Sequence, residues 1–142
     1  MEKIGLIAGN RKFPILFSQA AKKRNYSVVA VAIKGETSRQ LKKFVDKIYW
    51  VGLNEFFRLM QIFKDEGINK IVMAGQISPY RLFRKEVRKD EELKSLLGSI
   101  KDNRADTIFG AIADKLKASG FELQNSTIFM EEFMPKRGVL TK

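Results

Sequence analysis

Short apolar runs recur along the chain at regular intervals, and most of them are continuous rather than alternating with polar residues. Continuous runs are typical of strands that are buried on both faces, as in a parallel sheet. Four such runs predict strands at residues 4–8, 28–33, 48–51 and 71–74, and residues 121–123 are a candidate fifth strand.

Helical patterns occupy the intervals between these runs. Pro14 suits the first turn of a helix, where its missing N–H costs nothing. The apolar stripe expected on this helix consists of Leu16, Phe17, Ala20 and Ala21. Residues 38–44 form a shorter candidate helix.

Two further helices are predicted from capping residues and apolar spacing. Asn54 is expected to cap a helix that carries several phenylalanines and ends near Gly67. Asp106 is expected to cap another, which Gly120 closes. The side chains expected to face the core from this last helix are Ile108, Ile112 and Leu116.

Strands that alternate with helices require right-handed crossovers and favour a doubly wound α/β sheet. We predict one Rossmann-like domain over residues 1–142, with a mostly parallel sheet in the strand order 3-2-1-4-5. No linker rich in proline, glycine or serine divides the chain. The carboxyl ends of the first and fourth strands should then meet at the switch point, where such folds bind ligands.

The first strand ends at Gly9 and leads directly into a helix, so backbone N–H groups and the positive end of the helix should lie at the carboxyl edge of the sheet. That arrangement favours phosphate binding. The turn lacks the full G-x-G-x-x-G pattern of dinucleotide-binding folds. NAD-binding enzymes are expected to have a ribose-binding carboxylate near the tip of the second strand. Here Lys34 stands at that tip, and Glu36 follows two residues later. A glycine chosen only for a tight turn is the alternative interpretation.

A second glycine loop follows the fourth strand, where Gly75, Gln76 and Ile77 leave the sheet. Two such loops at neighbouring strand ends could form one concave site, with Gln76 against a base or a sugar hydroxyl. Downstream, residues 80–89 interleave five basic residues with two aromatic ones. We interpret this segment as a solvated helix in preference to a phosphate, RNA or membrane contact.

The charge balance sharpens the choice of ligand. The chain has 27 Lys and Arg against 16 Asp and Glu, a net charge of +11, which attracts phosphorylated metabolites, nucleic acid or an acidic membrane face. It contains no histidine and no cysteine, which excludes Ser-His and Cys-His catalysis, histidine-containing zinc sites and disulfides. No apolar run is long enough for a membrane span, and no signal peptide is recognised, so we expect a cytoplasmic location.

An ordered series of motifs extends over nearly all of the chain. It resembles the N-terminal half of the bacterial UDP-2,3-diacylglucosamine pyrophosphatases of the LpxI type. The segments that carry the resemblance are residues 3–9 with Phe13-Pro14, residues 29–35, 50–53 and 72–75, Arg104-Ala105-Asp106 leading into Ala113-Asp114, and residues 138–141.

The resemblance implies a membrane-associated cytoplasmic hydrolase of lipid A biosynthesis. Enzymes of this family use magnesium to split UDP-2,3-diacylglucosamine into UMP and lipid X, and substrate lies between two halves. The C-terminal half carries the catalytic carboxylate. This chain departs from the family at Asn10 and Arg11, where the family usually has more glycine.

We therefore expect a substrate-binding domain with no catalytic residue or metal ligand of its own, and with magnesium required only by the whole enzyme. Its expected partners are UDP-2,3-diacylglucosamine or lipid X, the C-terminal half or a second subunit, and the inner-membrane surface. A basic nucleic-acid-binding module and an NAD(P)-binding oxidoreductase domain are the alternatives. The residues expected to line the site are Gly9, Asn10, Arg11, Lys12, Phe13, Gly75, Gln76 and Ile77, with Arg104 and Asp106 as secondary candidates.

Overall fold

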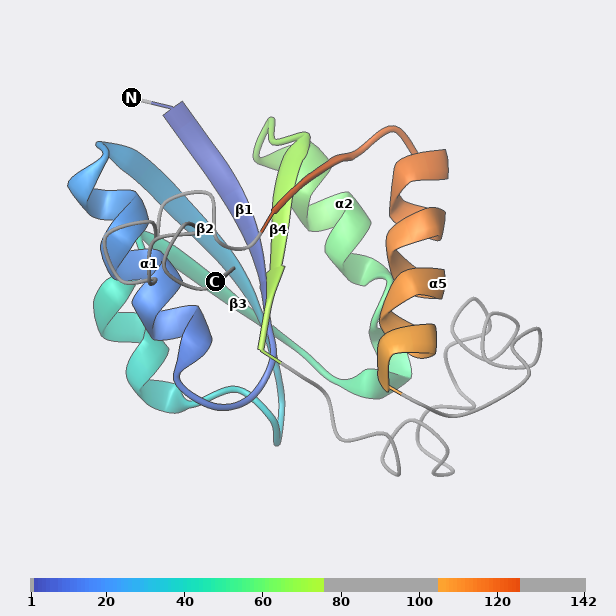
Figure 1. The fold of residues 1–142 in the computed structure, drawn as a ribbon, viewed down its shortest axis with the longest axis horizontal. Helices are drawn as coiled ribbons and strands as arrows, with labels where there is room; N and C mark the ends of the chain where they lie inside the picture. Colours follow the sequence, from blue (N-terminus) through green and yellow to red (C-terminus); the bar gives the residue numbers. More distant parts are fainter. Residues whose placement is uncertain (1, 76–104, 126–142) are drawn as a thin grey trace, which may run out of the picture.

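The computed structural model describes residues 2–75 and 105–125 of the 142-residue chain. In this part of the chain five parallel strands form one sheet in the order β3-β2-β1-β4-β5 (Figure 1), which confirms the predicted Rossmann-like fold and strand order. The strands are β1 (Glu2–Ala8), β2 (Tyr26–Ile33), β3 (Lys47–Val51), β4 (Lys70–Ala74) and β5 (Glu122–Gln124). The helices are α1 (Phe13–Lys23), α2 (Arg58–Asp65) and α5 (Ala105–Ala118), with 3₁₀-helices η1 (Arg39–Phe44) and η2 (Leu53–Glu55).

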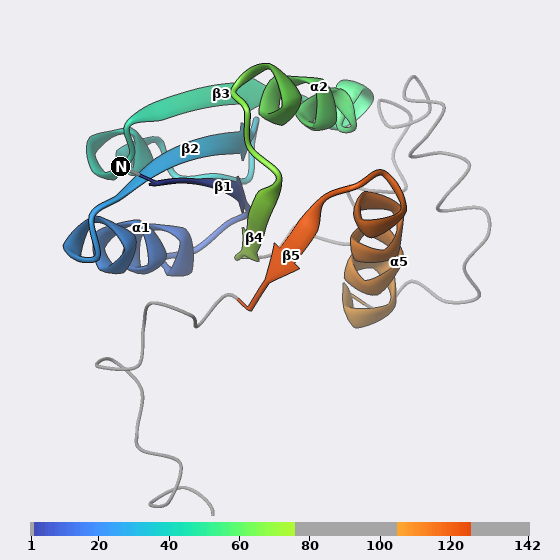
Figure 2. The same cartoon turned by 90° about the horizontal axis from the view of Figure 1, so that it is seen from above.

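Helices cover both faces of the sheet, which explains why the central strands are apolar at consecutive positions. Helix α1 and η1 lie on one face, and α2 and α5 lie on the other (Figure 2). Successive residues of β1 serve the two layers in turn: Leu6 packs with the α1 layer and Ile7 with the α2 and α5 layer. Buried strands of this kind are expected in a doubly wound sheet.

Two local expectations about α1 and α2 are wrong. Leu16 is 38% exposed and lies at the margin of the buried face of α1. Helix α2 begins at Arg58 rather than just after Asn54, because Gly52 and Glu55 first close a 3₁₀ turn. In that turn the Glu55 N–H donates to the Gly52 carbonyl at 3.1 Å, and the Gly52 N–H donates to Glu55 Oε2 at 3.4 Å.

The last helix differs less from its prediction. Asp106 is the second residue of α5 as described, so it is not the residue that precedes the helix. Ile112 and Leu116 are fully buried, as predicted, and Gly120 follows the helix with a φ of +97°. None of the helices in the described part of the chain is long and apolar enough to cross a membrane.

Gly5 lets α2 pack closely on the middle of β1. A Cβ atom at this position would lie 2.8 Å from Cε1 of Phe63 and 3.2 Å from Cγ2 of Ile68. Both neighbours belong to the buried core beneath α2. The absence of a side chain at Gly5 is therefore a packing requirement of the fold.

We predict that Gly5→Ala destabilises the fold by about 1–3 kcal/mol, because the added methyl group overpacks a closed core. Gly110→Ala is the matched control, since a Cβ there meets nothing within 4 Å and the position lies inside α5. The control should be stabilising by about 0.5–1 kcal/mol. Urea unfolding of the three proteins measures both effects, and equal stabilities of the Gly5 variant and the parent would contradict this account of the packing.

Candidate functional site

The turns after β1 and β4 meet at the carboxyl edge of the sheet. Ala8 and Ala74 are partners in the register of the two strands, and the Gly9 N–H donates to the Ala74 carbonyl at 2.7 Å. The two glycine loops that the sequence singled out are therefore neighbours at the switch point of the sheet.

Gly75 fits this junction because it lacks a side chain. Its φ is +85°, a conformation that favours glycine. A Cβ there would lie 2.6 Å from the Asn10 carbonyl oxygen and 2.9 Å from the Gly9 carbonyl carbon. The space beside Gly75 is thus filled by the backbone of the other turn.

The Gly9 turn presents cations at the start of α1. Arg11 has a φ of +70°, an unusual value for a residue with a side chain. Arg11 and Lys12 are both exposed. No side chain caps the first turn of α1, and the N–H groups of Ile15 and Leu16 both donate to the Lys12 carbonyl. The positive end of the helix and two cationic side chains therefore lie together, where an anion is favoured.

The carboxylate of Glu36 reaches this turn from the loop after β2, and the sequence pattern did not predict it as a site residue. Asn10 Nδ2 donates to Glu36 Oε1 at 2.9 Å. The chain reverses after β2, since the N–H groups of Glu36 and Thr37 both donate to the Ile33 carbonyl at 3.0 Å. This turn carries Glu36 back to the β1 loop, although it stands beyond the strand tip in the sequence. The buried Asn10 Oδ1 has no hydrogen-bond partner among the described residues.

The Thr37 side chain holds the loop after β2 against the end of β1. Its buried hydroxyl accepts a hydrogen bond from the Ile33 N–H at 2.8 Å and donates one to the Ala8 carbonyl at 2.6 Å. The hydroxyl therefore ties the end of β1 to the loop after β2. Without it, two backbone groups at the switch point would lose a partner.

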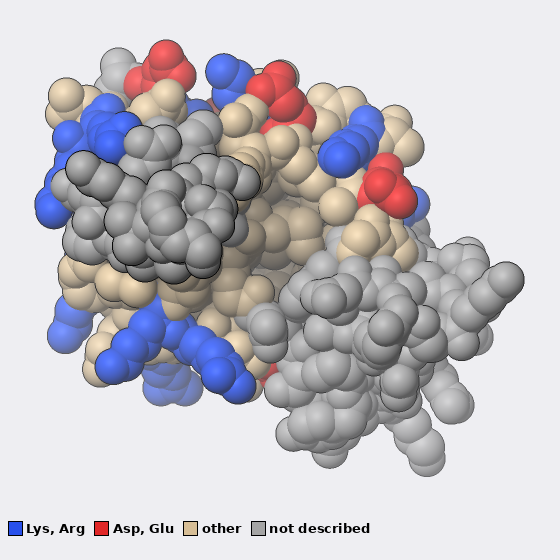
Figure 3. Space-filling view, viewed as in Figure 1, with Lys and Arg blue, Asp and Glu red and all other residues tan. Residues whose placement is uncertain are grey.

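A hollow of about 650 Å³ lies beside this loop, at the carboxyl ends of β2 and β3. Sequence reasoning did not find it, because its lining comes from three separate segments. In the space-filling view, basic side chains gather at the lower margin of the face shown, the edge at which the strands end (Figure 3). The lining residues are Lys34, Gly35, Thr37, Arg39, Lys42 and Trp50.

Several predicted site residues fall outside the described part of the chain. Gln76, Ile77, Arg104 and the basic segment 80–89 are in this group. Asp106 lies near the start of α5, and its side chain is not described. The structure therefore brings together Gly9, Asn10 and Gly75 directly, with Arg11 and Lys12 on the same turn.

Residues 2–75 and 105–125 contain no group of three or more carboxylate side chains placed to hold a metal ion. What this edge offers is positive charge, the start of a helix and a hollow, which are features that bind anions.

These features define a Rossmann-like α/β domain with a basic carboxyl edge. The family model of the LpxI N-terminal domain matches residues 3–133, and the chain belongs to this family. A curated relative is the UDP-2,3-diacylglucosamine pyrophosphatase LpxI of Caulobacter vibrioides, which is 23% identical over 144 residues. The match covers 100% of this chain and 50% of the relative, so the chain spans about half the length of that protein.

Two solved structures share a similar chain trace at low identity. N5-carboxyaminoimidazole ribonucleotide synthetase from Thermotoga maritima is 19% identical, with a TM-score of 0.42, over 84% of this chain and 31% of that one. The leucoanthocyanidin reductase–NADPH complex from Vitis vinifera is 15% identical, with a TM-score of 0.45, over 86% of this chain and 48% of that one.

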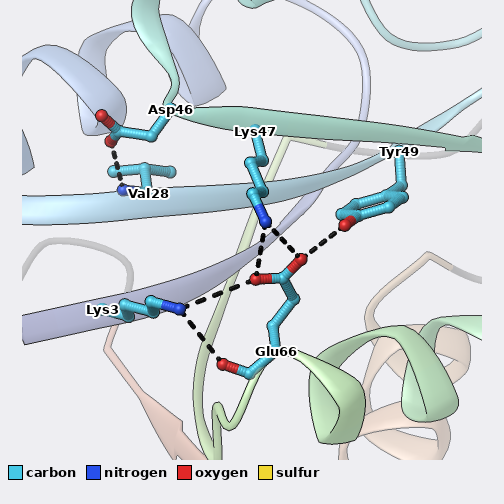
Figure 4. A network of polar contacts seen from close by, with 6 residues as sticks. All are labelled: Lys3, Val28, Asp46, Lys47, Tyr49 and Glu66. Atoms are coloured by element: carbon cyan, nitrogen blue, oxygen red, sulfur yellow. Dashed lines mark hydrogen bonds and ion pairs between the residues drawn. The ribbon is translucent and has the colours of Figure 1, made fainter.

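A second cluster of titratable side chains lies at the opposite, amino edge of the sheet (Figure 4). The Glu66 carboxylate, only 10% exposed, accepts hydrogen bonds from the Tyr49 hydroxyl at 2.5 Å and from Lys47 Nζ at 3.1 Å. Lys3 Nζ lies 3.7 Å from the same carboxylate. The pKa of Glu66 is lowered, most strongly by the hydrogen bond from Tyr49 and next by the hydrogen bond from Lys47. The hydrogen bond to Glu66 raises the pKa of Tyr49 and of Lys47.

We predict that Glu66→Gln lowers the free energy of unfolding by about 1–3 kcal/mol at neutral pH, because it removes charged hydrogen bonds. Since folding lowers the pKa of Glu66, the ionised carboxylate stabilises the fold above the ordinary pKa of 4.5. That stabilisation should disappear as the pH falls through the lowered, folded-state pKa. Urea unfolding at about pH 7 and about pH 3 measures the difference. Glu2→Gln, at an exposed position of β1, is the control. A penalty at Glu66 that is the same at both pH values would contradict the assignment.

Proposed function

We propose that this chain is the substrate-binding half of a UDP-2,3-diacylglucosamine pyrophosphatase, which converts UDP-2,3-diacylglucosamine and water into lipid X and UMP. The observation that carries the proposal is the match of the LpxI N-terminal domain over residues 3–133. The Caulobacter relative is a UDP-2,3-diacylglucosamine pyrophosphatase, which supports the proposal. The activity itself is proposed for a protein that includes a second half or a second subunit.

The geometry of the carboxyl edge supports a role in binding the pyrophosphate. Arg11 and Lys12 stand at the uncapped start of α1, beside the junction of Gly9 and Gly75. A pyrophosphate diester carries two negative charges, which favour the positive end of a helix and nearby cations. Of the other predicted site residues, Asn10 belongs to the same turn and Phe13 is the first residue of α1. The remaining proposed contacts are Gln76, Ile77, Arg104 and Asp106.

In this division of labour the chain binds and orients substrate and the other half supplies the catalytic carboxylate. Magnesium would neutralise charge on the transferring phosphoryl group. In this proposal the residues that hold magnesium belong to the other half of the enzyme. We also propose a location at the cytoplasmic face of the inner membrane, where a diacylated substrate would reside.

We predict that the chain binds UDP-2,3-diacylglucosamine in detergent micelles and that Lys12→Gln weakens this binding about 5–10-fold, the effect of one charged contact. Lys70→Gln is the matched control: it removes the same charge from the exposed start of β4, at the other edge. Calorimetric titration measures both variants. The rival nucleic-acid function would appear as salt-sensitive oligonucleotide binding with no preference for the glycolipid. Equal losses in the two variants would contradict a site at the Gly9 turn.

We predict that the 142-residue chain does not release UMP from the substrate at an appreciable rate, even with magnesium. Metal-assisted attack needs a carboxylate-held metal and a positioned water, which we assign to the other half. Fusing a family C-terminal half after Lys142 should restore the release of UMP. Robust turnover by the unfused chain that is lost in Asp106→Asn would instead make this chain a complete enzyme.

A further inference from the structure

The hollow beside the β2 loop has one planar aromatic wall, and the register of β3 explains it. Ile48 packs against the core of the α1 face, whereas Tyr49 packs against the core of the opposite face. Trp50 follows two residues after Ile48 and therefore belongs to the α1 face. It is half-buried and lines the hollow. The hollow thus has a surface on which a flat ring can stack.

Two cations stand on one side of η1. Arg39 and Lys42 are three residues apart, and a 3₁₀-helix brings side chains at that spacing into line. Ser38 begins η1, and its hydroxyl accepts a hydrogen bond from the Gln40 N–H at 3.2 Å. Arg39 and Lys42 both line the hollow, whereas Lys43, the next residue of η1, is not among the lining residues.

The loop that forms the floor of the hollow is held in place before any ligand arrives. Gly35 has a φ of +84°, which suits the sharp turn after β2. Both hydrogen-bonding roles of the Thr37 hydroxyl are used in holding the loop to β1 and β2. A site built on such fixed backbone loses little freedom when a ligand binds.

Charge and shape together select the class of ligand. Lys34, Arg39 and Lys42 bring three positive charges to one hollow. The positive field of Arg39 and Lys42 on one side of η1 favours an anion such as a phosphate. The nearby Glu36 carboxylate accepts a hydrogen bond from Asn10. A ligand with both a phosphate and a planar ring matches the cations and the indole at once.

We propose that this hollow binds a nucleoside phosphate, with its base against Trp50 and its phosphate beside Arg39 and Lys42. The inference deepens the proposed function, on which the choice of uridine rests. The hollow adjoins the Gly9 turn, because Thr37 is bonded to the end of β1 and the neighbouring Glu36 is bonded to Asn10. The uridine end of a UDP-linked substrate would occupy the hollow while its pyrophosphate extends toward the start of α1.

Trp50 is the one tryptophan of the sequence, so indole fluorescence reports on this hollow without labelling. The chain is titrated with UMP, AMP, uridine, inorganic phosphate and glycerol 3-phosphate. UMP should change the fluorescence saturably and bind at least about tenfold more tightly than each of the other compounds, since it alone offers both the charge and the matching base. Lys42→Gln should weaken UMP binding about 5–10-fold, whereas Lys43→Gln, a neighbour on η1, should change it less than about twofold.

Four results would overturn the inference. Inorganic phosphate or glycerol 3-phosphate binding as tightly as UMP would make this a phosphate site without base recognition. Equal binding of AMP would remove the assignment to uridine. Equal losses in the Lys42 and Lys43 variants would show only a general positive field. Substrate binding without any UMP signal from Trp50 would leave the proposed function standing and overturn this site. A selective UMP signal without glycolipid binding would support this site and overturn the proposed function.

Discussion

The contact between the turns after β1 and β4 is the constraint on which the rest of the carboxyl edge depends. Gly75 lies so close to the Gly9–Asn10 backbone that no side chain fits between them, and the Gly9 N–H is bonded to the Ala74 carbonyl. This contact sets the ends of the two strands level with each other. The start of α1 is placed by the same contact, because only three residues separate Gly9 from the helix.

The two edges of the sheet use charge in different ways. At the amino edge, Lys3, Lys47 and Tyr49 surround the nearly buried Glu66 carboxylate, so opposite charges are matched within the fold. At the carboxyl edge, Arg39 and Lys42 line a hollow. Matched charges stabilise a structure, whereas gathered like charges cost free energy unless an anion binds. This contrast distinguishes a structural network from a candidate binding surface.

Family membership and geometry point toward the same kind of role from separate observations. The family model identifies the chain as an LpxI N-terminal domain, and the described residues place cations, a helix start and a hollow on one edge. The chain spans half of the Caulobacter relative. The proposed role, a domain that binds and positions substrate for chemistry performed elsewhere, is consistent with both facts.

The sequence alone determined the strands and the two glycine turns, because burial periodicity and turn residues are local signals. The alternation of strands and helices predicted the strand order, and the ordered series of motifs indicated the family. The sequence placed the start of α2 wrongly, since the 3₁₀ turn between Gly52 and Glu55 competes with a cap at Asn54. Only the tertiary structure decided that Glu36 meets Asn10, 26 residues away, and that Trp50 shares a hollow with Lys42. Those contacts depend on how the loops reverse at the carboxyl edge, and no local pattern encodes that.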